Sequence, residues 1–210
     1  MVDVGDIHST SVHLHVSRAG DESPYIALSH RWGVGIPLTL RRENINNFRR
    51  SIGDGELPRT FKDAVNITRQ LKVRYLWIDS LCIIQNDPED WEREAKLMED
   101  VFSSAYCTIA ASCARSTEDG FLKTRRDRQC VETQVGKDPP LYICELIDDF
   151  RNDVEQEKLN KRGWVLQERV LSRRTIYFAK NQVYWECGHG VRCETLTKMV
   201  KCVNLGTCNS

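Results

Sequence analysis

Short apolar runs alternate along this chain with segments whose apolar residues recur at helical spacing. Residues 25–30, 75–79 and 106–111 are mainly apolar runs of strand length. Residues 60–72 and 88–105 lie between them and place apolar side chains three and four positions apart, which is typical of amphipathic helices. Strands that alternate with helices pair in parallel through right-handed crossovers. The pattern therefore predicts an α/β fold with a mostly parallel central sheet.

Two residues are expected to begin these helices. Thr60 is a candidate N-cap for the first helix, with Asp63 three residues later. Asp87 is a candidate N-cap for the second helix. It is followed by Pro88 at the first helical position, where the N–H that proline lacks would have no intrahelical partner. Both helices are therefore expected to start where the sequence supplies a side-chain acceptor.

The chain divides into one predicted domain and two ends. Residues 1–24 show no apolar periodicity and are expected to form a weakly ordered lead-in or a short edge strand. The domain spans residues 25–190, and residues 191–210 are expected to form a weakly ordered tail.

The second half of the domain is expected to hold shorter elements. Residues 141–146 form a further strand candidate, and the acidic stretch 148–157 is expected to be a solvated helix or loop. Residues 163–171 carry a helical pattern. Residues 175–178 and 182–187 are two strand-like runs with a short turn between them, which predicts a β-hairpin.

The charge balance excludes one class of partner. The 210 residues carry 30 Lys and Arg against 30 Asp and Glu, so no excess of positive charge is present to neutralise a phosphate backbone. We therefore expect no nucleic-acid partner. No stretch reaches 18 consecutive apolar residues and no signal-peptide core is present, so we expect an intracellular protein without a membrane span.

The cysteines favour reduced thiols over a disulfide framework. Nine cysteines, an odd number, are spread through apolar runs and loops alike. A zinc site would need ligands such as those near the C-terminal end, namely Cys187, His189, Cys193 and Cys202. The spacing of these residues fits no common zinc module. We therefore expect no metal site.

Polar side chains follow two of the predicted strands. Ser29, Arg31 and Trp32 come at the end of the first strand, and Asp79 ends the second. Open α/β sheets bind ligands in the crevice outside the carboxyl ends of their strands. Arg31 is suited to hold a pyrophosphate and Trp32 to stack against a ring. The alternatives are a surface arginine and a tryptophan that covers the sheet edge.

Cys82 and His30 offer a second chemistry at the same edge. A thiol becomes a nucleophile when a base lies close to it, so the pair is a candidate for nucleophilic catalysis. The apolar neighbours Leu81 and Ile83 favour a small buried cysteine instead.

Several sequence blocks occur in a characteristic order. They are YIALSHRWG at 25–33, WIDSLCIIQ at 77–85, WEREA at 91–95, YCTIAAS at 106–112 and RGWVLQE at 162–168. Together they resemble the heterokaryon incompatibility (HET) domain of filamentous fungi, and the resemblance covers most of the chain.

Two short motifs extend the resemblance to the TIR domain. Leu28 to Arg31 is similar to the Leu-Ser-x-Arg that ends the first TIR strand, and Trp164 to Glu168 is similar to the TIR motif Trp-Cys-x-x-Glu. This resemblance implies a TIR-like, flavodoxin-like three-layer sandwich, to which the predicted hairpin is added at the C-terminal end. In enzymatic TIR domains the glutamate of this motif carries NAD cleavage.

The TIR resemblance implies a site around Glu168. It makes Glu168 the candidate catalytic residue and NAD the substrate, with no permanently bound cofactor. It makes five residues candidates for binding the dinucleotide: Ser29, Arg31, Trp32, Asp79 and Trp164.

Glu168 has a role that can be stated physically. In a helix over 163–171, Trp164 and Glu168 are four residues apart and share a face. A carboxylate at that place can stabilise the oxocarbenium character that develops when an N-glycosidic bond to nicotinamide breaks. The alternative is a structural ion pair with one of the nearby arginines at positions 162, 169 and 173.

The HET resemblance implies a cytoplasmic protein of fungal non-self recognition that triggers programmed cell death after unlike hyphae fuse. Two mechanisms stay open. One is an NAD glycohydrolase switched on by self-association, and the other is a non-catalytic signalling module whose helices recruit partners. The expected partners are further copies of the chain in a homo-oligomer, and NOD-like or other incompatibility proteins.

Overall fold

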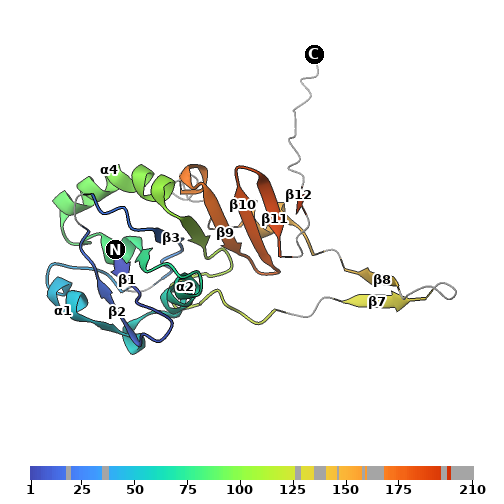
Figure 1. The fold of residues 1–210 in the computed structure, drawn as a ribbon, viewed down its shortest axis with the longest axis horizontal. Helices are drawn as coiled ribbons and strands as arrows, with labels where there is room; N and C mark the ends of the chain where they lie inside the picture. The colour runs from blue at the N-terminus through green and yellow to red at the C-terminus, as the bar shows by residue number, and fades with distance from the viewer. Residues whose placement is uncertain are drawn as a thin grey trace, which may run out of the picture.

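A ten-stranded mixed sheet lies at the centre of the computed structural model (Figure 1). The structure describes residues 1–17, 20–34, 38–125, 129–134, 141–145, 147–157, 159, 168–194 and 198–199.

The four central strands of the sheet run parallel to one another. In spatial order they are β5 (Tyr75–Trp77), β3 (Tyr25–Ser29), β6 (Cys107–Ala110) and β9 (Arg174–Phe178). Numbered by their place in the chain they follow the order 2-1-3-4, which belongs to a common doubly wound arrangement. The predicted α/β class is confirmed, and so are the three predicted strands of the parallel centre.

Antiparallel strands extend the sheet on both sides. β1 (Val2–Asp3), β2 (Ser11–Leu14) and β4 (Ile52–Gly53) lie beyond β5, and β10 (Val183–Cys187), β11 (Gly190–Cys193) and β12 (Lys198–Met199) lie beyond β9. β9 and β10 pair antiparallel, so the predicted C-terminal hairpin is confirmed. The whole sheet is therefore mixed, with its parallel strands in the middle.

Both predicted ends contribute to this sheet. β1 pairs with β5, and the side chains of Val2, Val4, Val12 and Leu14 lie in the hydrophobic core. Residues 1–17 thus hold short strands, as the second of the two predicted alternatives has it, and these strands are packed into the domain. At the other end, β11 and β12 place part of the expected tail in the sheet, and the rest of the tail lies outside the described residues.

The helices vary from single turns to a helix of 17 residues. They are α1 (Ile45–Arg50), α2 (Arg59–Gln70), α3 (Asp79–Cys82) and α4 (Pro88–Ser104), with a 3₁₀ turn η1 (Asp54–Glu56), a π-helical turn η2 (Arg151–Glu155) and helical residues 168–171. The two predicted helices are confirmed as α2 and α4.

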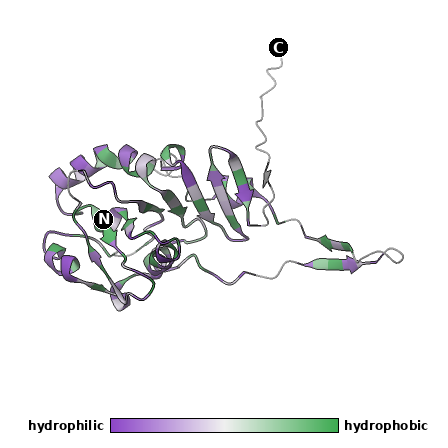
Figure 2. Ribbon diagram, viewed as in Figure 1, coloured by the Kyte–Doolittle hydropathy of each residue, from purple (hydrophilic) through white to green (hydrophobic). Residues whose placement is uncertain are grey.

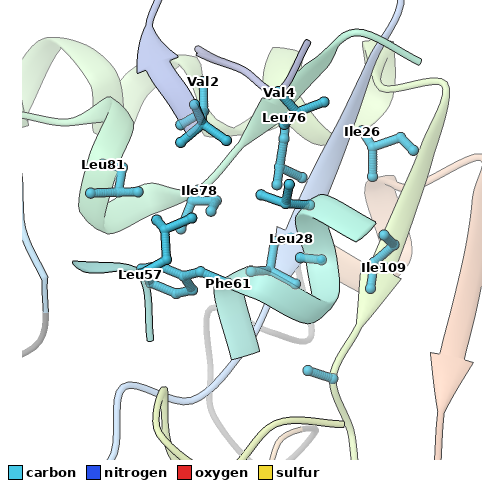
Figure 3. Packing of buried hydrophobic residues seen from close by; sticks show 14 of the residues in the cluster. Val2, Val4, Ile26, Leu28, Leu57, Phe61, Leu76, Ile78, Leu81 and Ile109 are labelled. Atoms are coloured by element: carbon cyan, nitrogen blue, oxygen red, sulfur yellow. The ribbon is translucent and has the colours of Figure 1, made fainter. Parts of the chain in front are cut away.

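The two long helices cover opposite faces of the parallel strands. Phe61 of α2 packs in a core with Ile26 and Leu28 of β3 (Figure 3). Phe102 of α4 packs with Ala27, the residue between them in the chain. Successive side chains of a strand point to opposite faces, so α2 and α4 form the outer layers of a three-layer structure.

One of the two predicted helix caps is correct. The side chain of Asp87 accepts a hydrogen bond from the backbone N–H of Asp90 at 3.3 Å, and Pro88 is the first helical residue of α4. Thr60 does not cap α2, which begins one residue earlier. Its hydroxyl instead donates to the carbonyl of Ser116 at 2.9 Å and thereby ties the loop after β6 to α2.

The acidic stretch predicted to be solvated is partly buried. It contains η2, in which the side chains of Asp153 and Val154 lie inside the protein. The hydroxyl of Tyr184 donates to Asp153 at 2.7 Å, and burial raises the pKa of Asp153 despite this bond. The stretch is therefore anchored against the C-terminal hairpin.

The part of the chain between β6 and β9 includes a two-stranded ribbon that projects from the body (Figure 1). It consists of β7 (Cys130–Thr133) and β8 (Leu141–Cys144), which pair only with each other. The predicted strand at 141–146 therefore forms, but outside the main sheet. Figure 2 shows hydrophobic residues along this ribbon, away from the core.

One cysteine differs from the expectation of reduced thiols. Cys130, in the ribbon, is disulfide-bonded. Five other cysteines in the described part of the chain are free, namely Cys82, Cys107, Cys113, Cys187 and Cys193. Burial raises the pKa of Cys107 to about 11, so this thiol stays protonated and unreactive at neutral pH.

We predict that Phe61→Ala lowers the free energy of unfolding by about 3 to 5 kcal/mol. Phe61 is fully buried where α2 meets the sheet, and its truncation leaves a cavity between the two layers. Urea denaturation followed by circular dichroism measures the change. Leu97→Ala is the control, because Leu97 is 41% exposed on α4 and its truncation should cost less than about 0.5 kcal/mol. Equal losses in the two variants would contradict this account of the core.

Candidate active site

A pocket of about 280 Å³ opens beside the carboxyl ends of β3 and β5. Its walls come from these strand ends, from α3 and α4, and from the helical turn at 168–171. Doubly wound sheets place their ligand sites at this edge, where the chain reverses its direction across the sheet. The lining residues are Leu28, His30, Trp32, Trp77, Asp79, Ile83, Gln85, Trp91, Ala95, Met98 and Glu168.

Glu168 is joined to the central strand by a hydrogen bond. The hydroxyl of Ser29, the last residue of β3, donates to Oε2 of Glu168. Ser29 is 3% exposed and stands 139 positions earlier in the chain. The fold thus brings the catalytic candidate and one predicted binding residue into direct contact.

The turn that carries Glu168 is also fixed to β6. The hydroxyl of Ser172 donates to the backbone carbonyl of Glu168 at 2.6 Å. The same hydroxyl lies 2.7 Å from that of Thr108 in β6. These bonds hold the backbone of Glu168 beside the parallel strands.

A second anchor joins the turn to the C-terminal hairpin. The guanidinium of Arg169 donates to both carboxylate oxygens of Glu186 in β10, at 3.1 and 3.3 Å, and to Glu155 at 3.4 Å. The hydroxyl of Tyr177 donates to Glu186 at 2.7 Å. Burial alone would lower the pKa of Arg169, but the bond to Glu186 raises it, so the ion pair persists. Arg169, one candidate for pairing with Glu168, is held by other carboxylates.

Asp79 holds Trp32 in place. Its Oδ2 accepts a hydrogen bond from the indole N–H of Trp32 at 2.8 Å, and its Oδ1 accepts one from the backbone of Ser80 at 2.6 Å. Nδ1 of the buried His30 lies 3.9 Å from the same Oδ1. The carboxylate of Asp79 therefore orients one wall of the pocket.

Four of the six predicted site residues lie in or against this pocket. Glu168, Trp32 and Asp79 line the pocket, and Ser29 reaches it through its bond to Glu168. Arg31 follows β3 but is not among the lining residues. Trp164 lies outside the described residues.

Cys82 is half-buried and lies outside the pocket. Its sulfur accepts a hydrogen bond from the backbone N–H of Ile78 at 3.4 Å, and it packs against the hydrophobic core. The pocket lining includes His30 and Gln85 but not Cys82. The geometry therefore does not support a pair of Cys82 and His30 in the pocket.

Several lining residues were not predicted as part of a site. Trp77 lies within a strand, where its apolar character indicates only burial. Trp91 and Met98 belong to a helical stripe that the sequence assigns to the core. Met98 does pack on that core, but Trp91 remains 50% exposed at the pocket. Its position near the start of a helix that follows a strand end is the signal that could have identified it.

Within the ranges that the structure describes, no group of three or more metal-ligating side chains comes together. In the same ranges, no helix is long and apolar enough to cross a membrane. Cys202, one of the soft ligands considered above, lies outside them.

The fold and the pocket define a doubly wound α/β domain with an acidic, tryptophan-lined crevice at the carboxyl edge of its sheet. The sequence model of the family described as heterokaryon incompatibility protein (HET) matches residues 25–168, and the chain belongs to this family.

One curated relative is similar to part of the chain. It is the heterokaryon incompatibility protein 6, OR allele, of Neurospora crassa, with 30% identity over 97 residues. The match covers 40% of this chain and 14% of the relative. No solved structure matches the chain.

We predict that Arg169→Met lowers the free energy of unfolding by about 2 kcal/mol, because it removes the two hydrogen bonds that the guanidinium donates to the largely buried Glu186. Combining it with Glu186→Gln should cost less than the sum of the two single changes, since the two groups interact directly. Chemical denaturation of the two single variants and the double variant measures this coupling. Additive losses would show that the anchor contributes nothing as a pair.

Proposed function

We propose that the chain is an NAD glycohydrolase that acts in heterokaryon incompatibility. The observation that carries this proposal is the contact between Ser29 and Glu168 at the edge of a pocket walled by tryptophans. It puts a carboxylate at the carboxyl edge of a doubly wound sheet, the place where such sheets bind nucleotides.

Hydrolysis of NAD requires a carboxylate held beside the ribose and a pocket that binds the nicotinamide ring. The bond between C1′ of the ribose and the pyridinium nitrogen breaks, and its electron pair goes to the nitrogen, so nicotinamide leaves as a neutral molecule. The ribose develops oxocarbenium character, which the carboxylate of Glu168 stabilises. Water then adds to C1′ and loses a proton, which gives ADP-ribose. Ser29 holds the carboxylate of Glu168 in position by its hydrogen bond.

The proposal includes a TIR-like fold. The parallel strands follow the order 2-1-3-4, which the flavodoxin-like arrangement shares. Ser29 lies in the motif that resembles the end of the first TIR strand, and Glu168 ends the motif that resembles the TIR glutamate motif. The contact between these two motifs supports the resemblance with geometry.

The name of the curated relative suggests the biological role that we propose for this chain. The Neurospora crassa protein is a heterokaryon incompatibility protein, and this chain spans 14% of its length. We extend that role to this chain: loss of NAD in the cytoplasm would bring about cell death after fusion of unlike cells. Self-association of the chain, with further incompatibility proteins as partners, would switch the activity on.

We predict that Glu168→Gln reduces NAD hydrolysis at least about 100-fold, because the neutral amide cannot stabilise developing positive charge. The assay follows the release of nicotinamide at high protein concentration. Cys82→Ala is the matched control and should keep the wild-type rate, since Cys82 does not line the pocket. Circular dichroism establishes that both variants are folded.

Two results would contradict this proposal. Unchanged hydrolysis by Glu168→Gln would remove the carboxylate from the mechanism. An inactive wild-type protein, even when self-associated, would favour the alternative of a non-catalytic signalling module.

A further inference from the structure

We propose that Trp91 makes the pocket selective for a flat, positively charged ring, so that it takes oxidised pyridinium nucleosides in preference to neutral ones. This inference rests on the proposed function and specifies the substrate class of the same pocket. It assigns a specificity role to a residue of α4 that lines the pocket.

The apolar stripe of α4 differs in exposure between its two ends. Trp91, Ala95 and Met98 are spaced four and three residues apart and form one stripe of the helix. Farther along, Met98 and Phe102 pack against the core that includes Ala27. Trp91 lies at the pocket and is 50% exposed. The stripe is thus fully covered by the protein at Phe102 and is available to a ligand at Trp91.

The lining of the pocket is acidic and rich in tryptophan. Two carboxylates, those of Asp79 and Glu168, and three tryptophans, Trp32, Trp77 and Trp91, line the pocket. Among the described residues that line it, none is a lysine or an arginine. The face of an indole ring carries negative potential and attracts cations, most strongly among the aromatic side chains. The lining therefore favours a flat cation over a neutral ring of the same shape.

The volume of the pocket limits how much of a ligand it can hold. A pocket of about 280 Å³ lies just below the usual range for small-molecule sites. It suits the pyridinium ring with its ribose, and it leaves the rest of a dinucleotide outside. Selectivity at this pocket is therefore selectivity for the ring that leaves.

The chemistry of the step gives this selectivity a consequence. Cleavage moves the bonding electron pair onto the ring nitrogen, so the ring loses its positive charge. The attraction of the tryptophan faces is then lost, and neutral nicotinamide leaves readily. A reduced dihydropyridine ring is neutral from the start and would bind weakly.

The test uses two small probes that the protein cannot cleave. 1-Methylnicotinamide carries the cationic ring, and nicotinamide is its neutral counterpart. Ligand-observed NMR titration gives the dissociation constant of each probe for the wild-type chain and for Trp91→Ala, Trp91→Phe and Leu97→Ala. Leu97 is an exposed residue of the same helix that does not line the pocket.

We expect the wild-type chain to bind the cation about three to ten times more tightly than the neutral probe. Trp91→Ala should remove most of this ratio, Trp91→Phe should keep part of it, and Leu97→Ala should leave it unchanged. Equal binding of the two probes by the wild-type chain would overturn the inference. An unchanged ratio in Trp91→Ala would overturn it as well.

These outcomes are separate from those of the hydrolysis assay. Hydrolysis that depends on Glu168, together with a ratio that does not depend on Trp91, would leave the proposed function standing and reject the inference. A wild-type chain that discriminates the probes through Trp91 but cleaves no NAD would keep the binding preference and reject the hydrolase.

Discussion

The hydrogen bond between Ser29 and Glu168 fixes the carboxylate at the pocket to the end of the central strand. It joins the end of the central strand β3 to a helical turn that the chain reaches only after a long crossover. Arg169 and Ser172 follow Glu168 in the same segment. Arg169 binds Glu186 of β10, and the hydroxyl of Ser172 lies beside that of Thr108 in β6. These anchors involve three different strands, and together they hold the carboxylate of Glu168 at the edge of the sheet.

The crevice itself follows from the path of the chain. From β3 the chain crosses to β5 through α2 on one face, and from β5 it returns past β3 to β6 through α4 on the other face. The two connections diverge beside β3, and a space opens at the carboxyl ends of the strands. Asp79 and Trp32 fill one side of this space and Trp91 borders it on α4.

The alternation of strands and helices predicted the parallel centre of the sheet, and adjacent residues predicted one helix cap, but individual long-range contacts were not predictable. Asp87 and Pro88 begin α4 as predicted because a helix cap depends on adjacent residues. The cap predicted at Thr60 fails because its hydroxyl binds a carbonyl 56 positions away. β1 is two residues long, so no periodicity could reveal it. The spacing of Trp91 predicts one apolar face but not whether protein or ligand covers that face.

The most direct test of the account is a crystal structure of the chain with an NAD analogue in which carbon replaces the ring oxygen of the nicotinamide ribose. Without that oxygen the ribose cannot form an oxocarbenium ion, so the analogue survives. We expect its pyridinium ring among Trp32, Trp77 and Trp91, with the carboxylate of Glu168 in contact with the sugar. An analogue bound at another surface, with this pocket empty, would contradict the central claim that these residues form a nucleoside site.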